Sequence, residues 1–556
     1  MSELLRRFKL DTRLTVELFI ASLFANILAL AMPIFVIQVL NRYIAHGVDI
    51  TLATLTFGAV IALVLEFFFR QARLKLATGL SSNVDSEISE LVFGSLIYSE
   101  KSELEKTASG QRQQCLNSLP SIQAAYNAVN ISSVLDIPFA LLFLATLFLL
   151  SATLGFVAAI FVCIALFVGT ATMWSMRNPT KQSLEVSGQI IPISVTASRE
   201  VDTIKAFNAG SFLIQRWKKH TFKLRELREQ VFGRQGLFQS FMQASAGLVS
   251  VATIAVGGVL VVKGDLDIGT LIGANILAVR AIQPVFRFTQ LVEVFVTAQQ
   301  AVDKLRRIII LPRDKSEGYA KKNYQGNFEI KDAAFIYARA RTPLFESLSF
   351  SVAPGQTVFC IGENGTGKST LARLMVGLVN PARGEVLLDG INLLQIAPEW
   401  WRRQIVFLPQ EPVLLSATIR ENIFINNPNM MDPKIQEIID KVGLRKFVDE
   451  SESGLDTSIT ENGRNLSVGI KKRIALARAI ATDGSLVILD EPTEGLDNEG
   501  MSVVGKVTRE LYQAGKAVVI FSHDPKAMTG ANLLIDLNSK PVPKVSRPKK
   551  IKADNN

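Results

Sequence analysis

Long apolar runs fill the first half of the chain and end near residue 290. Each run is about 17 to 23 residues long, and about 20 apolar residues let an α-helix cross a bilayer. Six runs of this kind are uncommon in a soluble core, so buried helices of a soluble protein are the weaker interpretation. We predict an all-α, six-helix transmembrane domain over residues 1–302. The predicted spans are residues 18–40, 51–69, 136–152, 156–176, 241–262 and 268–288.

The pattern changes in the second half, where short apolar runs alternate with helical periodicity. Phe328–Tyr337 alternates apolar and polar residues like a strand, and Thr357–Ile361 forms a short buried run before a helical segment. Alternating strands and helices predict an α/β fold. The chain is therefore expected to be multi-domain. The predicted parts are a basic linker over 303–326, an α/β domain over 327–540 and a basic C-terminal tail over 541–556.

The chain carries 60 basic and 50 acidic residues, a formal net charge of +10. Such an excess fits nucleic acid or an anionic membrane, and the apolar runs favour membrane lipid over nucleic acid. Lys and Arg gather before the first span and in segments 70–135 and 177–240, whereas the links 41–50 and 263–267 hold few. The positive-inside rule predicts a cytoplasmic N-terminus and α/β domain in an inner (plasma) membrane protein. The three cysteines match no disulfide or zinc spacing.

A few charged residues fall within or beside the spans. Glu66 and Arg70 are four residues apart and are expected to pair on one helix face. Arg280 lies inside the sixth span, and Arg287 follows seven residues later on the same face. An intramembrane arginine indicates a transport pathway, but the same pattern fits a side chain that extends to the interface. Both interpretations stay open.

Residues 362–370, GENGTGKST, fit the phosphate-binding pattern G-x-x-x-x-G-K-[ST] between a strand and a helix. Glycines let the backbone N–H groups face phosphate, and the helix N-terminus adds partial positive charge. A chance glycine-rich turn is the weaker interpretation. We expect ATP to be bound, with Lys368 on the β- and γ-phosphates and Ser369 on Mg²⁺. The predicted contacts are Gly362, Asn364, Gly365, Thr366, Gly367, Lys368, Ser369 and Thr370.

Polar residues at the ends of other strands are candidates for hydrolysis. The apolar run 485–489 ends in Asp490, a candidate Mg²⁺ ligand, and Glu491, placed to polarise the attacking water. Gln410 is expected to sense the metal or orient the water, and His523 to contact the γ-phosphate. Tyr337 is a candidate to stack on adenine. A surface acid pair and a core tyrosine are the plainer alternatives, and a lone glutamine or histidine is weak evidence.

The order of these motifs resembles an ATP-binding cassette domain. It runs from Tyr337 and the phosphate loop through Gln410, a signature at 466–470, Asp490-Glu491 and Asp497 to His523. With six spans in front, the chain resembles a half-transporter of the ABC exporters. Several stretches further resemble the type 1 secretion exporters of Gram-negative bacteria. They are residues 30–39, 135–139, 267–272 and 277–284.

The resemblance implies ATP-driven export of a polypeptide, with a membrane-fusion adaptor and an outer-membrane channel as partners. It also implies a homodimer, or a heterodimer with another ABC half-transporter. In the family, ATP lies between one subunit's phosphate loop and the other's signature, so Ser467, Gly469 and Asp497 would contact nucleotide. The first span begins almost at once, with no peptidase-like domain before it, as in the protease and lipase exporter subgroup. A lipid or small-molecule exporter, or an ATP-binding regulatory subunit, remains an alternative.

The signature departs from the usual L-S-G-G-Q of that family. Val468 stands in place of the first glycine, and Ile470 in place of the glutamine. Ser467 is expected to cap the following helix and Gly469 is kept. Val468 adds a β-branched side chain where phosphate is expected, and Ile470 removes a polar contact. Whether this signature supports normal hydrolysis, and whether the dimer is a homodimer or a heterodimer, stays open.

Overall fold

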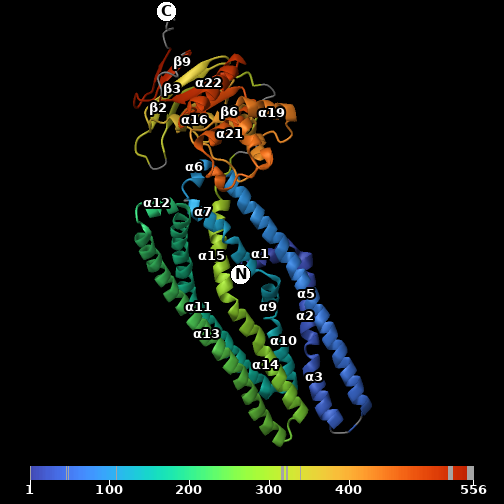
Figure 1. Ribbon diagram of the computed structural model, residues 1–556. Helices are drawn as coiled ribbons and strands as arrows, with labels where there is room; N and C mark the ends of the chain where they lie inside the picture. Colours follow the sequence, from blue (N-terminus) through green and yellow to red (C-terminus); the bar gives the residue numbers. More distant parts are fainter. Residues whose placement is uncertain are drawn as a thin grey trace, which may run out of the picture. The chain divides into compact units, whose positions relative to one another are not determined.

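The computed structural model describes residues 2–44, 47, 49–107, 109–314, 318–320, 324–337, 340–523 and 530–547. The chain divides into two compact units. The helical unit comprises Met1–Ser99 and Glu103–Pro312, and the sheet unit comprises Glu100–Ser102 and Arg313–Asn556. Each is visible in Figure 1 and is described by itself.

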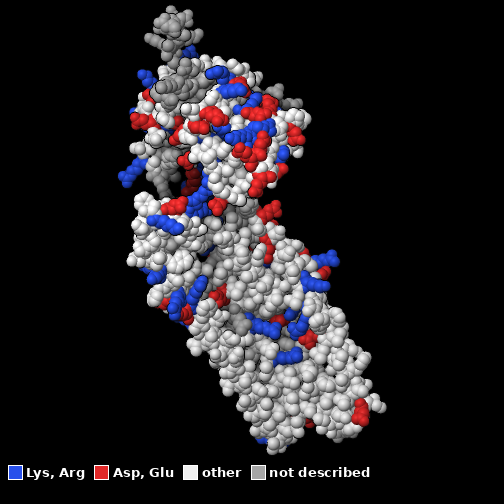
Figure 2. All heavy atoms as spheres, in the orientation of Figure 1, with Lys and Arg blue, Asp and Glu red and all other residues white. Residues whose placement is uncertain are grey.

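Among the described residues of the helical unit, six helical stretches are long and apolar enough to cross a membrane. They are Thr12–Tyr43, Asp49–Tyr98, Ala128–Leu150, Ala152–Arg199, Gly210–Val262 and Ile268–Ile309. The number of candidate spans agrees with the six expected from the sequence. Three of these helices contain 50, 48 and 53 residues, well beyond the roughly 20 that a bilayer needs. In Figure 2 the face of this unit around α3 and α14 shows few charged side chains.

The helices of residues 2–312 follow one another with short breaks. They are α1 Ser2–Leu10, α2 Thr12–Leu28, α3 Ala31–Gln38, the π-helical turn η1 Val39–Tyr43, α5 Asp49–Tyr98, α6 Lys101–Leu104, α7 Ser109–Leu116, α8 Leu119–Ala125, α9 Ala128–Leu135, α10 Phe139–Leu150, α11 Ala152–Arg199, α12 Val201–Ala206, α13 Gly210–Val262, α14 Ile268–Gln290 and α15 Val292–Ile309. Helices α11 and α13 run side by side (Figure 1).

Two element boundaries differ from those expected. The third span was expected from residue 136, but α10 begins at Phe139 after Pro138, which lacks the N–H that would continue α9. Residues 303–309, assigned to the linker, form the end of α15. The apolar side chains of Ala301, Leu305 and Ile308 recur at helical spacing and are buried in a cluster within the helical unit. Residues 315–317 and 321–323 of the linker, and 548–556 of the tail, lie outside the described residues.

The Arg280 side chain provides a hydrogen-bond donor for a backbone carbonyl of the first span. Pro33 in α3 has no N–H, so the carbonyl of Ala29, four residues earlier, loses its helical partner. Arg280 on α14 donates from Nη1 to Ala29 O at 2.7 Å. The partner of this side chain is thus a carbonyl freed by proline, and both interpretations of Arg280 drawn from the sequence stay predictions.

A second arginine makes the same kind of contact. Pro179 lies inside α11, which leaves the carbonyl of Ser175 without its helical N–H partner. Arg234 on α13 donates from Nη1 to that carbonyl oxygen. The two long helices α11 and α13 are thus tied together where α11 is interrupted.

Asp136, between α9 and α10, is the centre of a buried polar cluster. Its Oδ1 accepts from Arg73 Nη1 at 2.6 Å and from Asn26 Nδ2 at 3.1 Å. Arg287 Nη1 lies 3.9 Å from its other oxygen. The cluster therefore joins α2, α5 and α14 to the start of α10. The expected pair is also present, with Arg70 Nη2 of α5 lying 2.7 Å from Glu66 Oε1.

The sheet unit contains a six-stranded and a four-stranded sheet. The larger has the order β10-β9-β3-β8-β7-β6, in which β9, β3, β8, β7 and β6 are parallel and β10 is antiparallel to β9. The smaller is antiparallel, with the order β2-β1-β4-β5. The strands are β1 Phe328–Phe335, β2 Phe345–Val352, β3 Thr357–Ile361, β4 Arg383–Leu388, β5 Ile391–Asn392, β6 Ile405–Leu408, β7 Leu486–Asp490, β8 Ala517–Ser522, β9 Leu533–Asp536 and β10 Lys544–Ser546.

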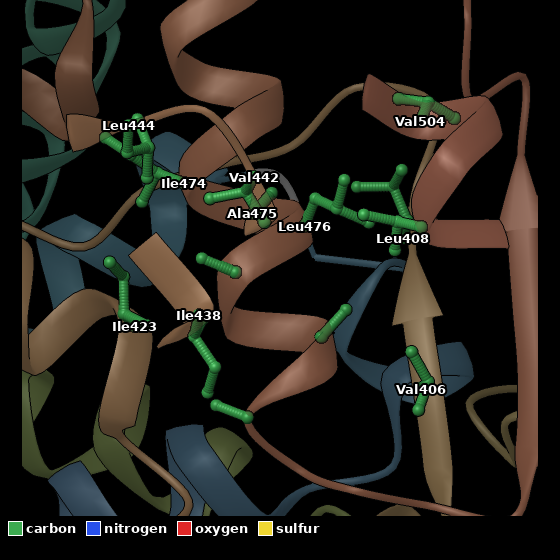
Figure 3. Packing of buried hydrophobic residues seen from close by; sticks show 14 of the residues in the cluster. Val406, Leu408, Ile423, Ile438, Val442, Leu444, Ile474, Ala475, Leu476 and Val504 are labelled. Carbon is green, nitrogen blue, oxygen red and sulfur yellow. The ribbon is translucent and has the colours of Figure 1, made fainter. Parts of the chain in front are cut away.

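Helices cover the larger sheet and give the unit its α/β character, as predicted. They are α16 Lys368–Met375, α17 Pro398–Arg402, α18 Ile419–Phe424, α19 Asp432–Lys441, α20 Arg445–Asp449, α21 Val468–Ile480 and α22 Asn498–Gln513, with 3₁₀ turns at Leu393–Gln395, Gly454–Asp456 and Glu461–Gly463. Figure 3 shows how α21 is held: Ala475 and Leu476 pack in one buried cluster with Val406 and Leu408 of β6 and Ile438 of α19. The middle of α21 is thereby packed against β6 and α19.

Candidate functional site

The phosphate loop lies between β3 and α16, as its sequence context predicts. Gly365 and Gly367 have φ values of +83° and +112°, a region that favours glycine. A Cβ on Gly362 would lie 2.3 Å from Thr366 Oγ1, and one on Gly367 would lie 2.8 Å from Leu344 Cδ2. Asn364 lies on the exposed part of the same loop. The loop conformation therefore depends on the glycines that define the motif.

Lys368 is the first residue of α16 and is only 6% exposed. Its Nζ donates to Gly362 O at 2.6 Å and lies 3.2 Å from Glu491 Oε1, an ion pair without hydrogen-bond alignment. A second, longer hydrogen bond joins Lys368 Nζ to Glu363 O at 3.3 Å, so the ammonium group is held at the loop by two carbonyls and one carboxylate. Two residues further along α16, Thr370 Oγ1 shares a 2.6 Å hydrogen bond with the hydroxyl of Tyr337. The half-exposed Tyr337 ring therefore lies beside the phosphate loop.

The two acids lie at the end of a fully buried strand: Asp490 is its last residue and Glu491 follows it. Asp490 ends β7 and is 3% exposed, and its Oδ1 has no hydrogen-bond partner. Burial raises the pKa of Asp490, and a hydrogen bond with Ser369 opposes that shift. Glu491 is 2% exposed and has a φ of +44°, which is uncommon for a residue with a side chain. Two carboxylates with different surroundings are thus placed one after the other.

The oxygen-bearing side chains of Ser369, Gln410 and Asp490 lie close together. Ser369 Oγ donates to Gln410 Oε1 at 3.2 Å, and the same hydroxyl lies beside the Asp490 carboxylate. A hydroxyl, an amide oxygen and a carboxylate with an unpartnered buried oxygen are hard ligands of the type that Mg²⁺ prefers. Within the described residues no group of three or more His, Cys, Asp and Glu side chains has metal-binding spacing. The mixed oxygen set of Ser369, Gln410 and Asp490 fits a divalent cation.

His523 completes this part of the site from the end of β8. Its Nδ1 lies 2.9 Å from Glu491 Oε2. The Glu491 carboxylate therefore lies between the ring of His523 on one oxygen and the ammonium group of Lys368 on the other. The structure brings together the residues predicted for metal binding and catalysis, while their chemical roles stay predictions.

The signature residues form a separate group. Ser467 caps α21 by accepting from Ile470 N at 3.3 Å, as expected, and Asp497 caps α22 by accepting from Gly500 N at 2.8 Å. Gly469 lies in the first turn of α21. Across the described parts of the chain, no hydrogen bond or ion pair joins Ser467, Gly469 or Asp497 to residues 362–370. The signature residues therefore lie outside the hydrogen-bonded group around the phosphate loop.

The two unusual signature residues have different surroundings. Val468 is 55% exposed at the first position of α21 and lies beside Gly495. Ile470 is partly buried and packs against the apolar cluster around α21. Only Val468 therefore faces solvent at the place where the family pattern has a glycine.

Two polar residues of the site were missed from the sequence. Lys472 of α21 is buried, and its Nζ donates to Glu491 O at 2.9 Å and also to Glu494 O. Glu494 Oε2 accepts from Gln410 Nε2 at 3.0 Å. A signal for Lys472 did exist, because it shares the helical spacing of buried Ala475 and Leu476. The sequence offered none for Glu494.

Comparison with known families matches both units. The ABC transporter transmembrane region matches residues 15–285, and the ABC transporter family matches residues 345–494, which contain the phosphate loop, Gln410 and Glu491. The chain belongs to the ABC transporters. It is a multi-pass membrane protein whose nucleotide-binding ATPase domain is coupled to transport. The expected fold class is thereby confirmed.

Similar curated proteins cover nearly the whole of this ABC transporter. The toxin RTX-I translocation ATP-binding protein of Actinobacillus pleuropneumoniae is 27% identical over 98% of this chain and 77% of its own length. The alpha-hemolysin translocation ATP-binding protein HlyB of Escherichia coli O157:H7 is 27% identical over 95% and 75%. The leukotoxin translocation ATP-binding protein LktB of Mannheimia glucosida is 27% identical over 94% and 74%. The similarity thus spans both units.

Proposed function

We propose that this ABC transporter exports a polypeptide across the inner membrane as the ATPase–permease of a type 1-like secretion system. The observation that carries the proposal is the similarity of both units to proteins named for toxin, hemolysin and leukotoxin translocation. An adaptor in the same membrane and an outer-membrane channel would be its partners. The distribution of Lys and Arg supports a cytoplasmic N-terminus and ATPase domain.

In this proposal ATP binds with its phosphates on residues 362–370 and its adenine on Tyr337. Lys368 exchanges Gly362 O and Glu491 for the β- and γ-phosphate oxygens. Ser369, Gln410 and Asp490 hold a Mg²⁺ ion, which offsets charge on the phosphates when bound. Asn364, Thr366 and Thr370 complete the loop around the phosphates.

Hydrolysis follows from the surroundings of Glu491. Its carboxylate lies at the end of β7, 2.9 Å from His523 Nδ1. Once Lys368 moves to phosphate, Glu491 is free to accept a hydrogen bond from water and to orient it for attack. His523 is 61% exposed, so its ring can contact both Glu491 and the γ-phosphate. Ser467, Gly469 and Asp497 of a second subunit would close the site.

A second candidate concerns the dimer. Exposed Val468 stands at the N-terminus of α21, where phosphate of the partner's nucleotide would approach. In a heterodimer the intact loop, Glu491 and His523 would face another chain's signature, and the site formed by Val468 would mainly hold ATP. This chain would then be a regulatory subunit with weak hydrolysis at one site.

The proposal is tested by purifying the tagged protein from native membranes with ATP bound and identifying what accompanies it. An adaptor, an outer-membrane channel and a secreted polypeptide are expected. Recovery of none of these, with ATPase activity stimulated by lipid or a small molecule instead, contradicts polypeptide export. A second ABC half-transporter in equal amount, together with weak ATPase activity of this chain alone, favours the regulatory subunit.

A further inference from the structure

The amide of Gln410 makes two contacts of opposite polarity. Its Oε1 accepts from Ser369 Oγ at 3.2 Å, and its Nε2 donates to Glu494 Oε2 at 3.0 Å. Ser369 can either donate or accept through its hydroxyl, so it imposes no direction on the amide. An ionised carboxylate only accepts, so Glu494 requires the NH₂ group on its own side. The direction of the amide is therefore decided by Glu494.

The direction of the amide matters because only its oxygen can bind a cation. With Nε2 on Glu494, Oε1 faces Ser369, which in turn contacts Asp490. In the opposite direction, two N–H groups would point at the cation site and repel the ion. A group that orients a metal ligand commonly changes metal affinity 10- to 100-fold when it is removed.

The turn that carries Glu494 is itself held in place. Lys472 Nζ donates to the carbonyl oxygens of Glu491 and Glu494, which lie at the two ends of the turn after β7. Burial lowers the pKa of Lys472, while the nearby carboxylates of Glu494, Glu491 and Asp490 oppose that shift. The lysine lies on α21, whose packing against β6 is shown in Figure 3. The backbone at Glu494 is thus held by a side chain of α21, the helix that begins with the signature.

We propose that Glu494 is a positioning residue that fixes the Gln410 amide with its oxygen toward the cation site formed with Ser369 and Asp490. The inference rests on the Mg²⁺ site proposed above and adds a residue that does not itself bind the ion. It implies that contact with Gln410, and not the negative charge of Glu494, is what the site needs.

The test is the factor by which saturating Mg²⁺ tightens binding of AMP-PNP, compared with binding in EDTA, to the purified full chain. Glu494→Asp keeps the charge but shortens the side chain, so it loses contact with Gln410. We expect it to reduce the Mg²⁺ factor about tenfold while affinity in EDTA is unchanged. Glu411→Asp is the matched control, because Glu411 is exposed and adjacent to Gln410 in sequence, and it should leave the factor unchanged.

Ser369→Ala separates failure of this inference from failure of the cation site. If Ser369→Ala lowers the Mg²⁺ factor while Glu494→Asp and Glu411→Asp both match the parent chain, the positioning role of Glu494 is wrong and the cation site stands. If Ser369→Ala also leaves the factor unchanged, the cation site itself is wrong. Equal weakening in Mg²⁺ and in EDTA by Glu494→Asp would also overturn the inference, because a general structural loss acts on both.

Discussion

Both units use a cationic side chain to satisfy a backbone carbonyl, but the two contacts differ in what can replace them. In the sheet unit Lys368 donates to Gly362 O at the mouth of the phosphate loop, where phosphate oxygens are alternative acceptors. In the helical unit Arg280 donates to Ala29 O, a carbonyl freed by Pro33. Hydrocarbon offers no substitute partner for that carbonyl. Lys368 can therefore leave Gly362 O for a phosphate oxygen, whereas Arg280 is expected to stay bonded to Ala29 O.

This difference predicts different consequences of substitution. Changes around Lys368 should alter nucleotide binding and hydrolysis while the fold persists. Changes around Arg280 should lower stability without a direct effect on chemistry. The predictions below test this contrast, beginning with the largest effect.

Replacing Glu491 with Gln removes the acid–base group but keeps its shape. We expect ATP binding to persist and turnover to fall roughly a hundredfold, the lower end for a lost general base. Steady-state ATPase activity and ATP affinity of the native complex measure both quantities. Hydrolysis at the parental rate would exclude this role for Glu491.

Replacing Lys368 with Ala should weaken ATP binding roughly tenfold or more, because an ammonium group on the phosphates is lost. The structure adds a second expectation. Without Lys368 the buried carboxylate of Glu491 loses an ion-pair partner at 3.2 Å, so the nucleotide-free protein should also be less stable.

A double variant separates the two effects of Lys368. Lys368→Ala with Glu491→Gln also removes the carboxylate that Lys368 pairs with, so it should regain thermal stability relative to Lys368→Ala while its ATP affinity stays low. Thermal unfolding and nucleotide titration of the same samples provide the comparison. Unchanged affinity in Lys368→Ala would remove the phosphate loop from the mechanism.

The sequence predicts the parts of the molecule whose signals are local. The six spans rest on apolar runs, and the loop at 362–370 rests on a contiguous motif, so both are visible without a structure. Contacts between distant residues are not. Arg280 and Ala29 are separated by 251 positions, and nothing in either neighbourhood specifies the other. The sequence alone therefore could not identify Ala29 O as the hydrogen-bond partner of Arg280.

The same limit applies inside the ATPase. Asp490 and Glu491 were predicted because they end an apolar strand, whereas Glu494 lies three residues later on an exposed turn without such a signal. Its importance depends on Gln410, which is 84 positions away. Ile470 likewise looked like a lost polar contact, and only the structure shows that it packs against the apolar cluster around α21.

Replacing Arg280 with Met should destabilise the helical unit by about 1–3 kcal/mol, because the carbonyl of Ala29 is left without a partner. Pro33→Ala restores an N–H that can bond to this carbonyl, so the cost of Arg280→Met should shrink in that background. Thermal unfolding in detergent measures the cycle. Arg287→Met is the control, because the Arg287 side chain is half exposed and its Nη1 lies 3.9 Å from Asp136 Oδ2. Equal losses from both arginines, or no coupling with Pro33, would contradict the contact.

The smallest effect is expected at the signature, where the structure separates two substitutions that the sequence groups together. Val468 is exposed at the start of α21. Val468→Gly should therefore admit phosphate more closely and raise the ATPase activity of the chain alone a few fold, with a stability cost of about 0.5–1 kcal/mol for glycine in a helix. Ile470→Gln instead removes an apolar side chain from the cluster around α21, so it should cost about 1 kcal/mol of stability. It should add little activity.

The two variants are compared with the unmodified chain by ATPase rate, oligomeric state and thermal unfolding. If the unmodified chain alone is a dimer with robust activity, and Val468→Gly adds nothing, then Val468 does not impair its site and the heterodimer candidate fails. If activity appears only with Val468→Gly, or only when a second half-transporter is added, the exposed valine is the feature that makes the chain depend on its partner.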